Sequence, residues 1–179
     1  MLKRFYPYNF VESPFVIDYG VLYEKGYRGI IFDIDNTLVH HGDDPTDRTD
    51  GLFRDLSEIG FKLFILSNNS SERIERFLKN VSVPYISEAG KPDPKNYAAA
   101  AEAMGVGVGE TIMIGDQVYT DVLGANRCGM ASILVDYIRA ENETRRGKKR
   151  LVESVVLRLY RKNRSMYQRL GNITFQERK

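Results

Sequence analysis

The sequence has a single cysteine, no tryptophan and no long uninterrupted apolar run. Cys128 alone cannot form an internal disulfide, so we expect the chain to occupy a reducing cytoplasm. No stretch approaches the ~18 to 20 apolar residues of a membrane-spanning helix. Residues 1–7 contain a basic pair but no apolar core, so a secretory signal is not expected. These absences argue against a disulfide-stabilised secreted fold and against a membrane-spanning one.

What is present is typical of one globular domain. The 179 residues are 42% hydrophobic and 28% charged, which is enough apolar material for a sizeable core. We therefore expect a single domain over residues 1–179. The net charge is +2, but from Arg139 onward thirteen Lys and Arg residues accompany only four Asp and Glu residues. A basic tail on an acidic body suggests that the tail meets an anionic partner.

The most informative stretch is residues 28–38, an apolar run that ends in Asp33 and Asp35. Residues 29–34 are apolar at nearly every position, which is typical of a strand buried on both faces of a parallel sheet. Two carboxylates at the end of such a strand are costly to desolvate unless they are paired or bind a metal. In open α/β sheets, ligands bind outside the carboxyl ends of the strands. The sequence thus places its most costly side chains where such a fold binds its ligand.

A second strand is predicted over residues 62–67 and ends at Ser67. Asn68 follows, at the start of a helix whose free backbone amides and dipole favour a phosphate. Taken alone, a strand that ends in serine is explained as well by helix capping.

A third strand, residues 111–116, ends at Asp116, and Asp121 adds an acid before the next helix. Between the second and third strands, Lys91 precedes a helix that begins at Asp93 and Pro94. In isolation Lys91 would be a solvated surface lysine, but its position before a strong helix start argues against that reading.

Four short motifs therefore occur in order: residues 32–38, Ser67, Lys91, and Gly115-Asp116 with Asp121. This set resembles the four motifs of the haloacid dehalogenase (HAD) superfamily of phosphotransferases. The resemblance implies an α/β fold, a three-layer α/β/α arrangement around a central parallel sheet. It also implies a phosphorylated substrate.

Chemistry and resemblance together suggest roles for the acids. Asp33 is hypothesised to be the nucleophile that forms an aspartyl-phosphate, with Asp35 as the general acid and base. A hard cation, Mg²⁺ with Mn²⁺ left open, would be held by Asp33 and Asp116 and, by resemblance, by the backbone carbonyl of Asp35. Asp121 would orient a metal-bound water or Lys91.

The remaining motif residues are expected to hold the transferring phosphoryl group. They are Ser67, Asn68, Lys91 and Thr37. His40 and His41, by contrast, are expected to be surface or loop-packing side chains, because no third ligand stands at metal-binding spacing.

Spacing also bears on the substrate. About 20 residues separate the first motif from the next strand and a similar number separates Asn69 from Lys91, which leaves no room for an inserted cap domain. An uncapped crevice suits a bulky, immobilised or polymeric substrate.

The overall layout is similar to the YqeG family of HAD subclass IIIA, which is related to phosphatidylglycerophosphate phosphatases. That resemblance implies a phosphatidylglycerophosphate-like lipid substrate and peripheral contact with a membrane. Two alternatives stay open: a nucleic-acid end or soluble sugar-phosphate phosphatase, and an RNA- or partner-binding protein that acts through its tail.

Two flanking segments complete the chain. The aromatic lead segment, residues 1–27, is expected to pack its rings over the sheet edge, although rings at a lipid headgroup layer are an alternative. The tail, residues 139–179, is expected to form a basic amphipathic helix that covers the sheet, makes a dimer contact, or binds anionic lipid or nucleic acid. Its apolar face would comprise Leu151, Val152, Val155, Val156, Leu159, Met166 and Leu170. The oligomeric state stays open.

Overall fold

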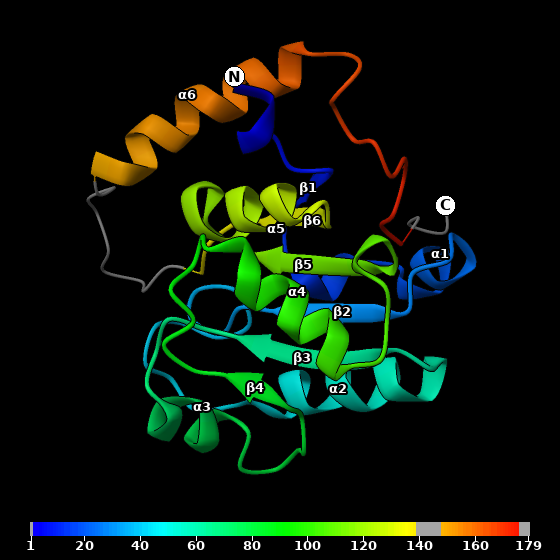
Figure 1. Ribbon diagram of the computed structural model, residues 1–179, viewed down its shortest axis with the longest axis vertical. Coiled ribbons are helices and arrows are strands. Elements are labelled where there is room, and N and C mark those ends of the chain that lie inside the picture. The colour runs from blue at the N-terminus through cyan, green and yellow to red at the C-terminus, as the bar shows by residue number, and fades with distance from the viewer. Residues whose placement is uncertain (1, 139–147, 176–179) are drawn as a thin grey trace.

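The structure is a computed structural model that describes residues 2–138 and 148–175. Its centre is one six-stranded parallel sheet with the strand order β1-β6-β5-β2-β3-β4 (Figure 1). The strands are β1 (Asn9–Val11), β2 (Gly29–Phe32), β3 (Lys62–Leu66), β4 (Tyr85–Ile86), β5 (Thr111–Gly115) and β6 (Ala131–Val135). The predicted α/β class with a central parallel sheet is confirmed.

Helices connect these strands. The α-helices are α1 (Tyr19–Glu24), α2 (Asp47–Ile59), α3 (Ser71–Phe77), α4 (Pro94–Ala103), α5 (Leu123–Cys128) and α6 (Lys148–Lys162). Shorter turns are the 3₁₀ segments η1 (Leu2–Phe5), η2 (Pro14–Val16) and η3 (Val108–Glu110) and the π-helical η4 (Val118–Val122).

The helices cover both faces of the sheet because successive strand residues point to opposite sides. From β2, Ile30 and Phe32 join a core cluster with side chains of α1, α2 and α3. Ile31 faces the other way and packs with side chains of α4 and α5. The result is the three-layer α/β/α arrangement that the motifs implied.

Local signals account for the helix boundaries. Thr46 and Thr49 form a capping box at the start of α2, and Gly60, with φ of 108°, ends it. At α4 the Asp93 side chain accepts a hydrogen bond from the Lys95 backbone N–H at 3.1 Å, and Pro94 takes the first helical position, as predicted.

No cap domain interrupts the described chain around the strand ends. Residues 33–61 hold a loop and α2, and residues 67–90 hold α3 and β4. Within the described residues, neither of these two segments contains a separate cap domain.

The ends of the chain show features that periodicity did not predict. The aromatic lead segment contributes β1, an edge strand that pairs with β6 and whose three residues are too few for a recognisable pattern. The C-terminal helix ends at Lys162 instead of continuing toward Asn172, so Met166 and Leu170 belong to the turns that follow it. Residues 139–147 and 176–179 of the predicted tail, and the side chains of residues 148–152, Leu151 and Val152 included, lie outside the described part.

The α6 helix is docked on its own domain. Val156 and Tyr160 are buried in a small cluster with Tyr6 and Val118, whereas Val155 and Leu159, which the predicted apolar face included, are 56% and 40% exposed. Among the described helices, none combines the length and apolarity that crossing a bilayer requires.

Candidate active site

The predicted site residues converge at the carboxyl ends of three neighbouring strands. Asp33 and Asp35 follow β2, Ser67 follows β3 and Asp116 follows β5, while Lys91 comes from the loop before α4. A cavity of about 160 Å³ opens among them. It is lined by Asp33, Asp35, Asn36, His41, Ser67, Asn68, Asn69, Lys91, Gln117 and Thr120.

Lys91 links two of the acids. Its Nζ lies 2.8 Å from an Asp33 oxygen and 2.7 Å from an Asp121 oxygen, and all three side chains are buried. A buried ammonium between two carboxylates offsets much of their desolvation cost. A solvated surface position for Lys91 is thereby excluded.

Asp33, Asp116 and Asp121 form an acidic cluster, in which one oxygen from each lies within 4.8 Å of the others. With Lys91 beside them, the three carboxylates leave an excess of two negative charges. Carboxylate oxygens are the ligands that a hard divalent cation such as Mg²⁺ prefers, and two positive charges would balance the excess negative charge of the cluster. In the fourth motif Asp121 was paired with Asp116 and was expected to have an orienting role, and the structure brings its carboxylate into this cluster.

The acids of β5 and η4 are held in place by their neighbours. The Gln117 backbone N–H donates to Asp121 at 3.1 Å, and a side chain at Gly115 would collide with the Asp121 carboxyl. The Thr37 hydroxyl donates to Asp116 at 3.4 Å. Thr37 is thus placed against an acid of the cluster and is not among the residues that line the cavity.

Burial dominates the electrostatics of the nucleophile candidate. Desolvation raises the pKa of Asp33 to about 6, with a further rise from Asp121, although the Lys91 ammonium opposes it. Burial lowers the pKa of Lys91, but the charges of Asp121 and Asp33 outweigh it, so its pKa is raised above the ordinary value. Lys91 therefore stays charged in the described site.

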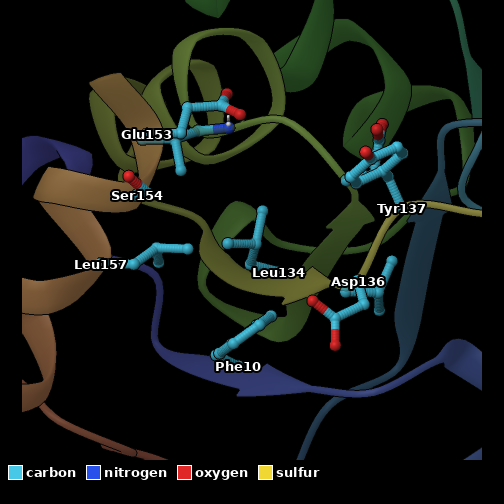
Figure 2. Close-up of a pocket in the computed structure, with 10 residues that line it drawn as sticks. Phe10, Leu134, Asp136, Tyr137, Glu153, Ser154 and Leu157 are labelled. Atoms are coloured by element: carbon cyan, nitrogen blue, oxygen red, sulfur yellow. Dashed lines mark hydrogen bonds between the residues drawn. The ribbon is translucent and has the colours of Figure 1, made fainter. Parts of the chain in front are cut away.

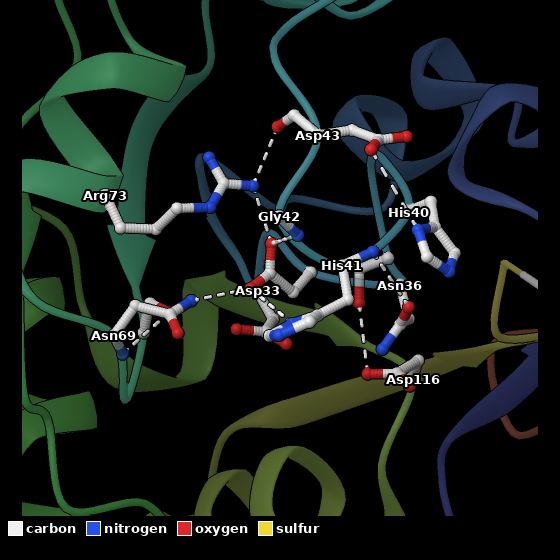
Figure 3. Close-up of polar contacts among 12 residues, drawn as sticks. Asp33, Asn36, His40, His41, Gly42, Asp43, Asn69, Arg73 and Asp116 are labelled. Carbon is white, nitrogen blue, oxygen red and sulfur yellow. Dashed lines mark hydrogen bonds and ion pairs between the residues drawn. The ribbon is translucent and has the colours of Figure 1, made fainter.

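Asp35 contacts a different set of partners, and these partners, Arg73, Gly42, Asn69 and His41, are labelled in Figure 3. Its Oδ1 accepts from the Arg73 guanidinium at 2.6 Å and from the Gly42 N–H at 3.3 Å, and its Oδ2 accepts from Asn69 at 3.0 Å and contacts His41 at 2.9 Å. Burial raises the pKa of Asp35, yet the Arg73 hydrogen bond and charge outweigh it, so its pKa lies below the ordinary value.

Ser67 and Asn68 lie on the wall of the cavity where a phosphate was predicted. Ser67 is buried, and its hydroxyl oxygen accepts hydrogen bonds from the Asn69 side chain at 2.9 Å and from the Asn69 N–H at 3.3 Å. Asn68 accepts from the Lys91 N–H at 2.8 Å, which ties the end of β3 to the lysine loop.

Sequence reasoning missed three residues around Asp35. His41 is an exposed loop histidine, as expected, but its contact with the Asp35 carboxylate was not predicted, and Arg73 and Asn69 were given no role. Arg73 lies in the first turn of α3, close to the end of β3, and this position is a signal that it could face the strand ends. No local pattern pointed to His41.

A smaller pocket of about 100 Å³ lies beside the site, between α6 and the ends of β5 and β6 (Figure 2). Asp116 is one of its lining residues. Two other residues that line this pocket are hydrogen-bonded to each other: the Glu153 carboxylate of α6 accepts from the Val118 N–H at 2.9 Å. The C-terminal helix thus contacts η4, the segment that carries Asp121.

A parallel sheet with clustered acids and one lysine at its strand ends is the arrangement of a HAD-type hydrolase. The chain belongs to the haloacid dehalogenase-like hydrolases, whose family model matches residues 39–129. It is 41% identical to the probable phosphatase YqeG of Bacillus subtilis (strain 168), over 75% of this chain and 80% of that protein. The family predicted from the four motifs, and the enzyme class it implies, are confirmed.

Two solved structures share the fold. The cobalt-bound deoxy-D-mannose-octulosonate 8-phosphate phosphatase (YrbI) of Haemophilus influenzae has a TM-score of 0.52 and 18% identity, covering 80% of this chain and 92% of that one. A protein of Listeria monocytogenes serotype 4b has a TM-score of 0.52 and 19% identity, covering 76% and 99%. At these identities the likeness concerns the fold alone.

Proposed function

We propose that this hydrolase cleaves phosphate monoesters through an aspartyl-phosphate on Asp33. The observation that carries the proposal is the buried contact of Lys91 with both Asp33 and Asp121, beside Asp116. Hydrolysis of phosphate monoesters is among the slowest uncatalysed reactions, which favours covalent catalysis combined with strong charge stabilisation. This cluster places a nucleophile, the Asp33 carboxylate, and a positive charge, the Lys91 ammonium, in one cavity.

The reaction would proceed in two displacements. The negative charge of a bound phosphate would raise the pKa of Asp35, which is low in the free site, so that Asp35 takes up a proton as substrate binds. An Asp33 oxygen then attacks phosphorus, the bond to the leaving oxygen breaks, and Asp35 gives that oxygen the proton. A water molecule then attacks the phosphorus of the aspartyl-phosphate and gives a proton to Asp35, which releases inorganic phosphate and restores Asp33. Lys91, Ser67 and the groups near Asn68 would hold the phosphoryl oxygens through both steps.

A divalent cation fits the acidic cluster. Asp33, Asp116 and Asp121 would hold Mg²⁺ directly or through water, and the Asp35 carbonyl is a further candidate ligand. When bound, Mg²⁺ would neutralise charge on the phosphoryl oxygens.

For the substrate we propose a bulky phosphate ester on a membrane surface, such as phosphatidylglycerophosphate. The absence of a cap over the described strand ends supports access by a large substrate. The outer face of α6 also supports it, because exposed Val155 and Leu159 lie among Arg158, Arg161 and Lys162. The cytoplasmic leaflet, with its anionic lipids, would be the partner.

Wild type and Asp33→Asn, assayed with Mg²⁺ on a substrate panel, test both proposals. The panel holds phosphatidylglycerophosphate in mixed micelles, glycerol 3-phosphate, a sugar phosphate and a 5′-phosphorylated oligonucleotide. We expect the highest kcat/KM on the lipid, and a loss of more than about 10³-fold in Asp33→Asn on every substrate. Asp55→Asn, at an exposed aspartate of α2, is the matched control and should keep full activity.

The outcomes test the proposed reaction and the proposed substrate separately. Retained activity in a folded Asp33→Asn variant would refute the nucleophile. A higher kcat/KM on the oligonucleotide or the sugar phosphate would refute the lipid substrate and leave the phosphatase reaction standing.

A further inference from the structure

The basic side of α3 contacts the loop that follows the first motif. Arg76 donates to the Gly42 carbonyl and pairs with Asp44 at 3.1 Å, and Lys79, just beyond the helix, also pairs with Asp44 at 3.1 Å. Arg73 donates to the Asp43 carbonyl at 2.9 Å. Of these three residues, Arg73 is the one that also contacts Asp35.

The Arg73 contact differs in kind from the other two. The Arg73 side chain is 12% exposed, whereas the side chains of Arg76 and Lys79 are about half exposed and make solvent-screened ion pairs of small energetic weight. Within the described residues, the Nε and Nη1 atoms of Arg73 are buried without a hydrogen-bond partner. Burying such donors is unfavourable, so the position of Arg73 calls for an explanation other than stability.

The two carboxylate oxygens of Asp35 have different partners. Oδ1 is held by Arg73 and by the Gly42 N–H. Oδ2 meets Asn69 and His41, and the His41 side chain is 70% exposed and lines the site cavity. An incoming group can replace an exposed contact far more readily than a buried one, so Oδ2 is the oxygen that a substrate can reach.

We propose that Arg73 is a positioning residue that anchors Asp35 through Oδ1 and so makes Oδ2 the atom that exchanges the proton. This inference rests on the proposed function. Oδ2 gives its proton to the leaving oxygen as the bond from that oxygen to phosphorus breaks, and it later takes a proton from the attacking water. The leaving group occupies the place that His41 holds in this structure.

Leaving-group dependence tests this role. The departure of an alkoxide needs a proton, whereas p-nitrophenolate leaves without one, so misplacing Asp35 should impair an alkyl phosphate far more than an aryl phosphate. The quantity to measure is the ratio of kcat/KM for glycerol 3-phosphate to kcat/KM for p-nitrophenyl phosphate, because kcat/KM reports the steps up to the aspartyl-phosphate. Each value is taken at the pH optimum of the variant, which removes the effect of altered Asp35 ionisation.

We expect Arg73→Gln to lower this ratio at least about tenfold, in the same direction as Asp35→Asn, which removes a general acid worth about 10²- to 10⁴-fold. Arg73→Lys keeps a donor and should lower the ratio less. Lys79→Gln is the matched control: it removes an ion pair to Asp44 in the same loop, contacts neither Gly42 nor Asp35, and should leave the ratio unchanged.

An equal loss on both substrates in Arg73→Gln would overturn the inference, and so would a comparable fall of the ratio in Lys79→Gln. The ratio does not depend on the folded fraction, so a destabilised variant still gives an answer. If wild type cleaves neither ester, nor any phosphate of the panel above, the proposed function fails and this inference fails with it.

Discussion

At the scale of single residues, Lys91 and Asp33 set the charge of the site. Their side chains are buried and 2.8 Å apart, and Asp121 lies on the other side of the ammonium. Even so, the desolvation of Asp33 outweighs the attraction of Lys91, which is why its pKa is raised to about 6. Without a metal ion, the Lys91 ammonium alone does not balance the negative charge of the clustered carboxylates at neutral pH.

The sign of the effect on stability follows from this shift. A carboxyl whose pKa is higher in the folded state than in the unfolded chain stabilises the fold below the unfolded pKa, and that contribution is lost as the pH rises through about 6. A divalent cation reverses the loss, because it binds the carboxylate form.

We predict that Mg²⁺ raises the midpoint of thermal unfolding more at about pH 7.5 than at about pH 5. In Asp33→Asn the metal-free midpoint should vary less with pH across this window. Scanning calorimetry with Mg²⁺ and with a chelator measures both effects. A larger Mg²⁺ effect at the lower pH would contradict the raised pKa.

At the scale of elements, η4 and α6 act together. η4 carries Asp121, and its Val118 N–H donates to Glu153 of α6 at 2.9 Å within a buried contact. The hydrogen bond joins residues 35 apart in sequence. A helix that lies outside the four motifs therefore supports the segment that holds one of the clustered acids.

We predict that Glu153→Ala lowers the free energy of unfolding by about 1 to 3 kcal/mol, because it leaves the buried Val118 N–H without this acceptor. Urea denaturation measures the change. Glu58→Ala, at an exposed glutamate of α2, is the control and should change stability by less than about 0.5 kcal/mol. An effect of Glu153→Ala no larger than that of the control would show that α6 does not stabilise η4.

At the scale of the whole molecule, the two ends of the chain interlock. Asn9 of β1 donates to the Gly171 carbonyl at 2.8 Å and accepts from the Leu170 N–H at 2.9 Å. Ile17 forms an antiparallel bridge with Thr174, and Ile173 is buried in the main core cluster. The segment after α6 is thus part of the domain core, although its composition is polar and basic.

We predict that Ile173→Ala destabilises the protein by about 2 to 5 kcal/mol, the usual range for truncating a fully buried aliphatic side chain. Phe175→Ala, two residues on and 64% exposed, should cost far less. Denaturant unfolding of the two variants side by side checks the difference. Equal effects would mean that the C-terminal segment is not packed as described.

The sequence alone was sufficient to predict much of the fold and the gathering of Asp33, Asp35 and Asp116 at the strand ends. The runs that end at Asp33, Ser67 and Asp116 predicted three strands, and parallel strands bring their carboxyl ends to one edge whatever the details of packing. The capping signal at Asp93 and Pro94 predicted the start of α4 from residues that are adjacent in sequence. Strand β1 could not be predicted from the alternation of apolar and polar residues, because three residues are too few to show a pattern.

Only the tertiary structure decided the side-chain partnerships. Asp35 meets Arg73 across 38 residues of sequence, Asp121 joins Asp33 and Lys91, and α6 buries Val156 and Tyr160 while Val155 stays exposed. Local patterns specify strands, helices and the direction of the chain, because these depend on residues a few positions apart. Which side chains face one another depends on how distant elements pack, and no local pattern contains that information.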